Sequence, residues 1–389
     1  RELFMKKRKL SCGILIFLLL LWGAMPLKAA ETDEDSYLEE MKDSVDFSGL
    51  DDFLSGIQTP EESLTFSGLV EELLDEGISG FDAGVIIEWL KDVLLGQLQE
   101  NRKLLIEVVL LAMGFSILKN FAGAFASSYI SDLCFILVYC VLAVMLLQSF
   151  LAFGEIAGGA LSDSVDFMTA LIPTFCITMV FSAGTGSAAG FYQTAFLVIY
   201  LVQWLFLNIL VPMIHIYVLM ELMNHFFEDE KFENLTELLK GMICWGMKIA
   251  GVAVLGLNVV QGLIAPAKDR LLHGGISRAA SLIPGIGNTI NGVSELLLGS
   301  GILIKNCVGA AALAILVLIA LMPMLQVACM AFFYKVAAVL AEPVTDKRIA
   351  GCLRGMAAGG VLYLKLMGYC IALFFLTIAL CTAVSGFIY

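Results

Sequence analysis

The chain has 389 residues, of which 59% are hydrophobic and only 15% are charged. Together with several apolar runs of 18 residues or more, this composition excludes a typical soluble protein and predicts a polytopic membrane protein. The net charge of −13 is concentrated in one place, because residues 31–100 hold 20 acidic and two basic side chains, which leaves +5 for the rest of the chain.

The N-terminal residues have the three parts of a secretory signal peptide. Basic residues at Lys6–Lys9 precede an apolar run at Ile14–Trp22, and small residues follow at Ala29–Ala30. We therefore predict a signal peptide over 1–30, with a retained anchor as the alternative because Lys28 interrupts the cleavage motif. In either case the segment that follows begins outside the cytoplasm.

The acidic extracytoplasmic segment, residues 31–100, contains apolar residues at helical spacing, such as Leu69, Val70, Leu73 and Leu74. This pattern predicts short amphipathic helices. Their acidic faces do not favour adhesion to anionic lipid. A solvated linker and a docking surface for a basic or apolar partner both fit the pattern.

From Leu104 onward, apolar spans occur at 104–125, 131–153, 167–183, 190–212, 242–264, 282–298, 302–325 and 357–384. Most reach the roughly 20 residues needed to cross the hydrocarbon core of a bilayer. We predict an all-α membrane protein of about seven or eight transmembrane or re-entrant helices. It comprises a first helix pair at 101–160 and two membrane repeats at 161–270 and 271–389.

Three short motifs occur twice in the same order. They are Leu171–Pro173 and Leu282–Pro284, Leu210–Met213 and Leu321–Met324, and Leu239–Met242 and Leu353–Met356. The first two pairs, marked by Pro173, Pro212, Pro284 and Pro323, share an offset of 111 residues. These repeated motifs predict an internal duplication of the membrane-spanning region.

Loop charges give the two repeats opposite predicted orientations. Acidic residues dominate the predicted loop at 154–166 and the region 221–237, which places neither in the cytoplasm. Two basic clusters follow later spans: Lys268, Arg270 and Arg278, and then Lys335, Lys347, Arg348 and Arg354. Because Lys and Arg favour cytoplasmic loops, we predict that both clusters are cytoplasmic. The repeats, with three crossings each, are then inverted, and the C-terminus lies outside.

Two short spans run into glycine- and serine-rich stretches at matching positions, Ser182–Gly190 and Gly299–Gly301. Paired interruptions of inverted repeats are typical of a transport path. A turn at the second stretch could bring Glu295 and Lys305 together as an ion pair lining a cavity, with separate interfacial positions of the two residues as the alternative. The predicted path comprises Gly184, Gly186, Ser187, Gly190, Glu295, Gly299, Ser300, Gly301 and Lys305. Close helix packing by small residues is the alternative.

The sequence contains no motif for catalysis or cofactor binding. Its ten cysteines lack metal-type spacing, and neither GxxxxGK[ST] nor HExxH occurs. A membrane-protease pair of Ser187 and His215 has no support from its spacing. We therefore predict no catalytic residue, no cofactor and no metal site, so that energy for any transport comes from a partner or a gradient.

Several motifs in this order resemble the stage III sporulation protein AE family. They are Leu171–Pro173 with the break at Ser182–Gly190, Leu282–Gly287, Leu303–Gly309, and Tyr334–Ala338 leading to Glu342–Pro343. The resemblance covers roughly residues 80–388.

The resemblance implies a component of the secretion-like channel between mother cell and forespore, located in the mother-cell membrane. It implies partners among the other stage III sporulation A-operon proteins, including a cytoplasmic ATPase, and a forespore membrane partner across the intermembrane space. The lipid bilayer is a further partner, and nucleic acid is not. The implied role is a permease or export gate, with a non-conducting scaffold of the same complex as the alternative.

Overall fold

The computed structural model describes residues 45–56, 65–75, 128–226, 232–280, 287–343 and 347–384, together with positions 91, 96, 106, 110 and 114. Within 128–135 and 262–298 the description is of the backbone. All regular elements in this part of the chain are helices, which confirms the predicted all-α class. The predicted signal peptide, most of the 104–125 span, and Pro284 lie outside the described residues.

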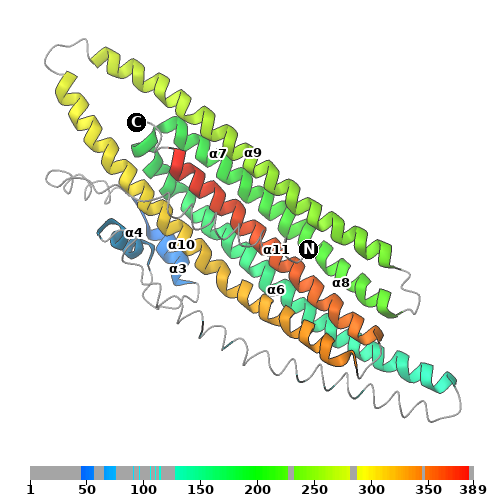
Figure 1. Ribbon diagram of the computed structural model, residues 1–389. Coiled ribbons are helices and arrows are strands. Elements are labelled where there is room, and N and C mark those ends of the chain that lie inside the picture. The colour runs from blue at the N-terminus through cyan, green and yellow to red at the C-terminus, as the bar shows by residue number, and fades with distance from the viewer. Residues whose placement is uncertain are drawn as a thin grey trace, which may run out of the picture.

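Five long helical segments lie side by side with alternating directions (Figure 1). They are α6 (Ser128–Ala183); α7 (Thr185–Leu201) continued by the π-helix η2 (Val202–Leu210) and α8 (Val211–Phe226); α9 (Glu233–Ala280); α10 (Gly287–Ala341); and α11 (Lys347–Val384). Each segment contains a stretch long and apolar enough to cross a membrane. The protein is therefore a multi-pass membrane protein.

These helices are longer than a bilayer requires. Four of the five candidate spans have 37 to 44 residues, which corresponds to about 55 to 65 Å of α-helix. The hydrocarbon core of a bilayer is only about 30 Å thick. The bundle therefore extends beyond the hydrocarbon on at least one side.

The predicted loop at 154–166 is wrong. α6 continues through it, so the predicted spans 131–153 and 167–183 are two parts of one helix. The acidic residues in this stretch, Glu155, Asp163 and Asp166, are exposed on one side of the helix, while the other side packs into the core. A charge on one face of a helix lowers the hydropathy of the segment without ending the helix.

The interruption predicted at Gly299–Gly301 is also wrong. α10 runs without a break from Gly287 to Ala341, through both Gly299–Gly301 and Pro323. Glycine lowers helix propensity, but in membrane proteins small residues let two backbones approach closely. Packing against a neighbouring helix therefore outweighs the local preference at this point.

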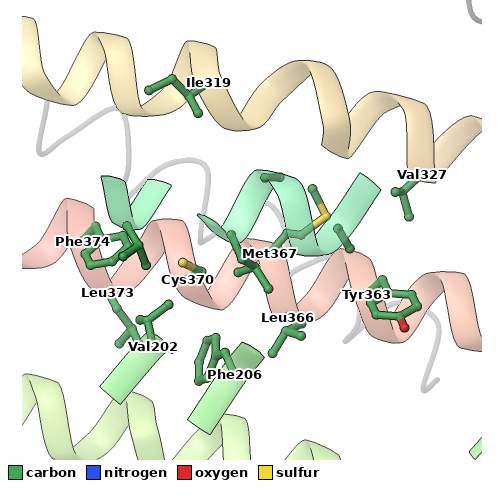
Figure 2. Packing of buried hydrophobic residues seen from close by; sticks show 14 of the residues in the cluster. Val202, Phe206, Ile319, Val327, Tyr363, Leu366, Met367, Cys370, Leu373 and Phe374 are labelled. Atoms are coloured by element: carbon green, nitrogen blue, oxygen red, sulfur yellow. The ribbon is translucent and has the colours of Figure 1, made fainter. Parts of the chain in front are cut away.

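α11 lies at the centre of the bundle, and its buried side chains contact several neighbouring helices. Figure 2 shows Leu366 and Leu373 of α11 near Val202 and Phe206 of η2. The labelled residues Ile319 and Val327 lie on α10, on the opposite side of α11. Among lipids the hydrophobic effect does not drive helices together, so close packing of this kind holds the bundle.

The short helix α4 (Phe66–Asp75) confirms the amphipathic helix predicted around Leu69–Leu74, and another short helix, α3 (Ser48–Ser55), precedes it. The Asp51 carboxylate accepts hydrogen bonds from the backbone N–H groups of Phe66 (2.6 Å) and Ser67 (3.2 Å), which caps the start of α4. α3 packs on α6, where the Phe53 and Phe167 rings lie 5.8 Å apart, and α4 packs on α10. The apolar faces of both helices are thus buried against the protein's own bundle.

Two of the three repeated motifs lie on helices in matching order, whereas Leu171–Pro173 lies inside α6 and its counterpart at 282–284 lies outside the described residues. Pro212 is in α8 and Pro323 is in α10, while the motif glycines Gly241 and Gly355 are in α9 and α11. The two motifs thus assign the predicted repeat to a helical hairpin: α7–η2–α8 with α9 in the first copy, and α10 with α11 in the second.

The two hairpins run in the same direction, so the predicted inversion is wrong. Asn258 of α9 donates a hydrogen bond to Thr377 of α11 (3.2 Å), and Gly251 lies beside Tyr369, so later residues of α9 meet later residues of α11. Because predicted spans fuse into longer helices, each copy crosses the bundle twice. An even number of crossings preserves orientation.

Parallel hairpins also correct the loop assignments. Tyr139 contacts both Leu222 near the end of α8 and Cys352 near the start of α11, so the end of α8 with Glu221 and the start of α11 with Lys347 and Arg348 lie at one end of the bundle. The basic cluster Lys268–Arg278, on the last part of α9, lies toward the opposite end. The two basic clusters therefore lie at opposite ends, so the prediction that both are cytoplasmic is wrong. The prediction that the 221–237 region lies on the other side of the membrane from the second cluster is also wrong.

Candidate functional site

The first predicted glycine stretch forms the junction between α6 and α7. Gly184 has φ 98°, a conformation that favours glycine, and separates the two helices by one residue. Its N–H donates to the Met179 carbonyl and its carbonyl accepts from the Ala188 N–H, both at 3.1 Å. The predicted interruption is therefore confirmed here, with the backbone groups of Gly184 satisfied locally.

The second glycine stretch packs against this junction. A Cβ atom added at Gly301 would lie 3.0 Å from the carbonyl carbon and oxygen of Phe181 and 3.2 Å from the amide nitrogen of Ser182. The structure thus brings the two predicted stretches together at the end of α6. At Gly301 the two helices pack closely, as expected if this glycine serves helix packing and does not line a translocation path.

The other path candidates on α7 and α10 differ in burial. Ser187, Gly190 and Ser300 are buried, whereas Gly186 and Gly299 are half-buried. The Ser300 hydroxyl is buried and has no hydrogen-bond partner in the described part of the chain. Their role as a translocation path stays a prediction.

Lys305 is a buried cation in the same region. Its side chain is 0% exposed, and its ammonium group donates a 2.9 Å hydrogen bond to the backbone carbonyl of Thr382 near the end of α11. Carbonyls at a helix C-terminus carry partial negative charge, which offsets part of the cost of burying the ammonium group. α11 therefore provides a backbone partner for this charge.

The ion pair predicted between Glu295 and Lys305 depends on a turn that the structure lacks. Both residues belong to the continuous helix α10. Ten helical residues correspond to about 15 Å along the axis. The side chain of Glu295 lies outside the described residues.

No motif in the sequence points to a second polar cluster deep in the bundle. The Tyr363 hydroxyl lies 3.2 Å from Nε2 of His215, and a Cβ atom at Gly154 would lie only 2.4 Å from the same nitrogen. Nearby, the Tyr334 hydroxyl donates to Ser149. These contacts join α6, α8, α10 and α11 through residues far apart in the sequence, so only the fold reveals them.

Glycines on α11 allow α8 and α6 to approach closely. A Cβ atom at Gly359 would lie 2.3 Å from Val218 and 2.7 Å from Phe150, and one at Gly355 would lie 2.5 Å from Glu221. Gly351 faces His225 in the same way. The four-residue spacing of these glycines is the sequence signal that could have predicted this helix contact.

The exposed face of α6 changes in character near its middle. Between Ile136 and Leu151 most of its exposed large residues are apolar, with Gln148 as an exception. From Glu155 to Thr169 the exposed residues are polar or small, namely Glu155, Gly159, Ser162, Asp163, Asp166 and Thr169, before Val180 and Phe181 are exposed near the end of the helix. We call the set from Glu155 to Thr169 the acidic stripe. A charge facing hydrocarbon costs about 2.5–3.5 kcal/mol on insertion scales, so the acidic stripe borders water or another protein.

The structure separates the residues of the protease alternative. Ser187 and His215 are 28 residues apart on the nearly continuous α7–η2–α8 segment, which corresponds to about 40 Å. They cannot form a catalytic pair. Within the described ranges, no group of three His, Cys, Asp or Glu side chains is placed to bind a metal ion.

Comparisons with known proteins agree with the motifs found in the sequence. The family described as stage III sporulation protein AE matches residues 64–385. The chain is 28% identical over 357 residues to a protein named stage III sporulation protein AE from Bacillus subtilis (strain 168), covering 90% of this chain and 88% of that protein. No solved structure gives a significant match. The chain belongs to the stage III sporulation protein AE family.

Proposed function

We propose that this protein is a permease or export gate in the channel that connects mother cell and forespore during sporulation. The observation that carries this proposal is the acidic stripe of α6, which lies within the candidate membrane span Tyr139–Ser182. Carboxylates at that position need water or a protein partner. Because this span is longer than the hydrocarbon core is thick, either water beyond the bilayer or an aqueous path along α6 supplies the water, and we take the path as the source.

We place the protein in the mother-cell membrane, with the Gly184 end of the bundle facing the intermembrane space. α3 docks on the later half of α6, where the Thr174 hydroxyl donates to the Asp46 carbonyl (3.0 Å). α3 belongs to the segment predicted outside the cytoplasm. The opposite end carries the basic residues Lys347, Arg348 and Arg354, but Lys268, Arg270 and Arg278 lie toward the Gly184 end, so the position of α3 and not the loop charge carries this orientation.

The proposed partners are the other stage III sporulation A-operon proteins, including a cytoplasmic ATPase, and a forespore membrane protein. The sequence has no nucleotide-binding motif, so a separate ATPase would supply energy. In this role the protein is not an enzyme. The basic cytoplasmic end is where we expect a cytoplasmic partner to approach.

The acidic stripe provides the direct test of the path. We expect the double substitution Asp163→Asn and Asp166→Asn to reduce the yield of heat-resistant spores while protein level and partner co-purification stay normal. Glu237→Gln, an exposed acid on α9, is the control and should leave spore yield unchanged. Normal sporulation of the double variant would contradict the proposal.

A non-conducting scaffold is the second candidate function, and the α3–α4 region distinguishes it. A scaffold predicts that deleting residues 31–100 removes co-purifying partners, whereas neutralising the acidic stripe has no effect. Gly186→Trp is a further test of the path because Gly186 is half-buried. Gly301 is less suitable, since any side chain there meets the α6 backbone.

A further inference from the structure

We draw no further inference here: the strongest candidate, the pair of short helices α3 and α4 docked on α6 and α10 beside the acidic stripe, carries none, because the residues of the stripe stay exposed next to the docked pair and nothing in the structure shows that the pair moves or what covers its acidic outer face.

Discussion

The two copies of the helical hairpin differ most in their surroundings. Gly241 in α9 and Gly355 in α11 occupy the same place in the repeated motif. A Cβ atom at Gly241 would meet nothing within 4 Å, whereas at Gly355 it would lie 2.5 Å from Glu221. α11 is enclosed by other helices and α9 lies at the edge. A duplicated motif thus preserves the helix but not its environment.

The repeated prolines show a second difference. Proline lacks a backbone N–H and clashes with the carbonyl four residues earlier. Before Pro212 the chain forms the π-helix η2, and the Val211 N–H donates to the Phe206 carbonyl five residues back. Pro323 instead lies inside the α-helix α10. The wider π turn accommodates the proline in one hairpin, while packing accommodates it in the other.

Filling the contact between α8 and α11 should have the largest effect. Gly359→Leu places atoms where Val218 and Phe150 already lie, within 2.3 and 2.7 Å of the new Cβ. Overpacking typically costs about 1–3 kcal/mol and occasionally more, and the short distances at this site indicate the upper part of that range. We expect loss of folded protein, measured by thermal unfolding in detergent. Gly256→Leu on α9, where nothing lies within 4 Å, should unfold at nearly the native temperature; equal destabilisation would contradict the contrast between the hairpins.

Lys305→Met should impair function without lowering the stability of the protein. The buried Lys305 lies in the second hairpin. The residue 111 positions earlier, which is the offset between the repeated prolines, is Thr194 in the first hairpin. Burying a charge costs free energy unless it is paired, and Lys305 has a backbone carbonyl as its hydrogen-bond partner, so an apolar residue of similar size removes that cost. We expect an unchanged or higher unfolding temperature with fewer heat-resistant spores. A marked loss of stability would instead show that Lys305 serves the fold alone.

The matched motif glycines allow a smaller and more direct comparison. Gly→Ala in a helix interior stabilises by about 0.5–1 kcal/mol when space is available. Gly241→Ala should therefore raise the unfolding temperature, and Gly355→Ala should lower it because Glu221 must move. The measurement is the shift in unfolding temperature of each variant from that of the native protein, in the same detergent. Shifts of the same sign would contradict the different packing of α9 and α11.

The smallest expected effect concerns the prolines. Pro323→Ala restores a backbone donor within α10 and should stabilise by roughly 1 kcal/mol, less than the full cost of a helix-interior proline because packing already compensates. Pro212→Ala should change stability less, since η2 already avoids the clash. Unfolding temperatures of the two single variants provide the comparison. A larger gain at Pro212 would show that η2 has another cause.

Composition and local motifs predict much of this fold. The apolar spans indicate the all-α membrane class, and the break at Gly184 follows from the glycine-rich stretch itself. The amphipathic spacing around Leu69 and Leu73 likewise predicts α4. These features depend on neighbouring residues, which a sequence displays directly.

Helix continuity and relative direction could not be predicted in the same way. Acidic residues such as Asp163 on one face of α6 lower the local hydropathy as a loop would, so one helix resembles two. An error in the number of crossings then reverses the predicted orientation of the second copy. The contact between His215 and Tyr363 depends on this arrangement, because 148 residues separate the two side chains.

The side of the membrane on which α9 and α11 begin tests the parallel arrangement of the hairpins most directly. Single cysteines at Glu237 and Lys347, in a chain whose accessible native cysteines are replaced, can be labelled with a membrane-impermeant thiol reagent in oriented vesicles. The structure predicts that both positions react from the same side, since α9 and α11 run in one direction. Labelling from opposite sides would restore the inverted repeat and contradict the fold described above.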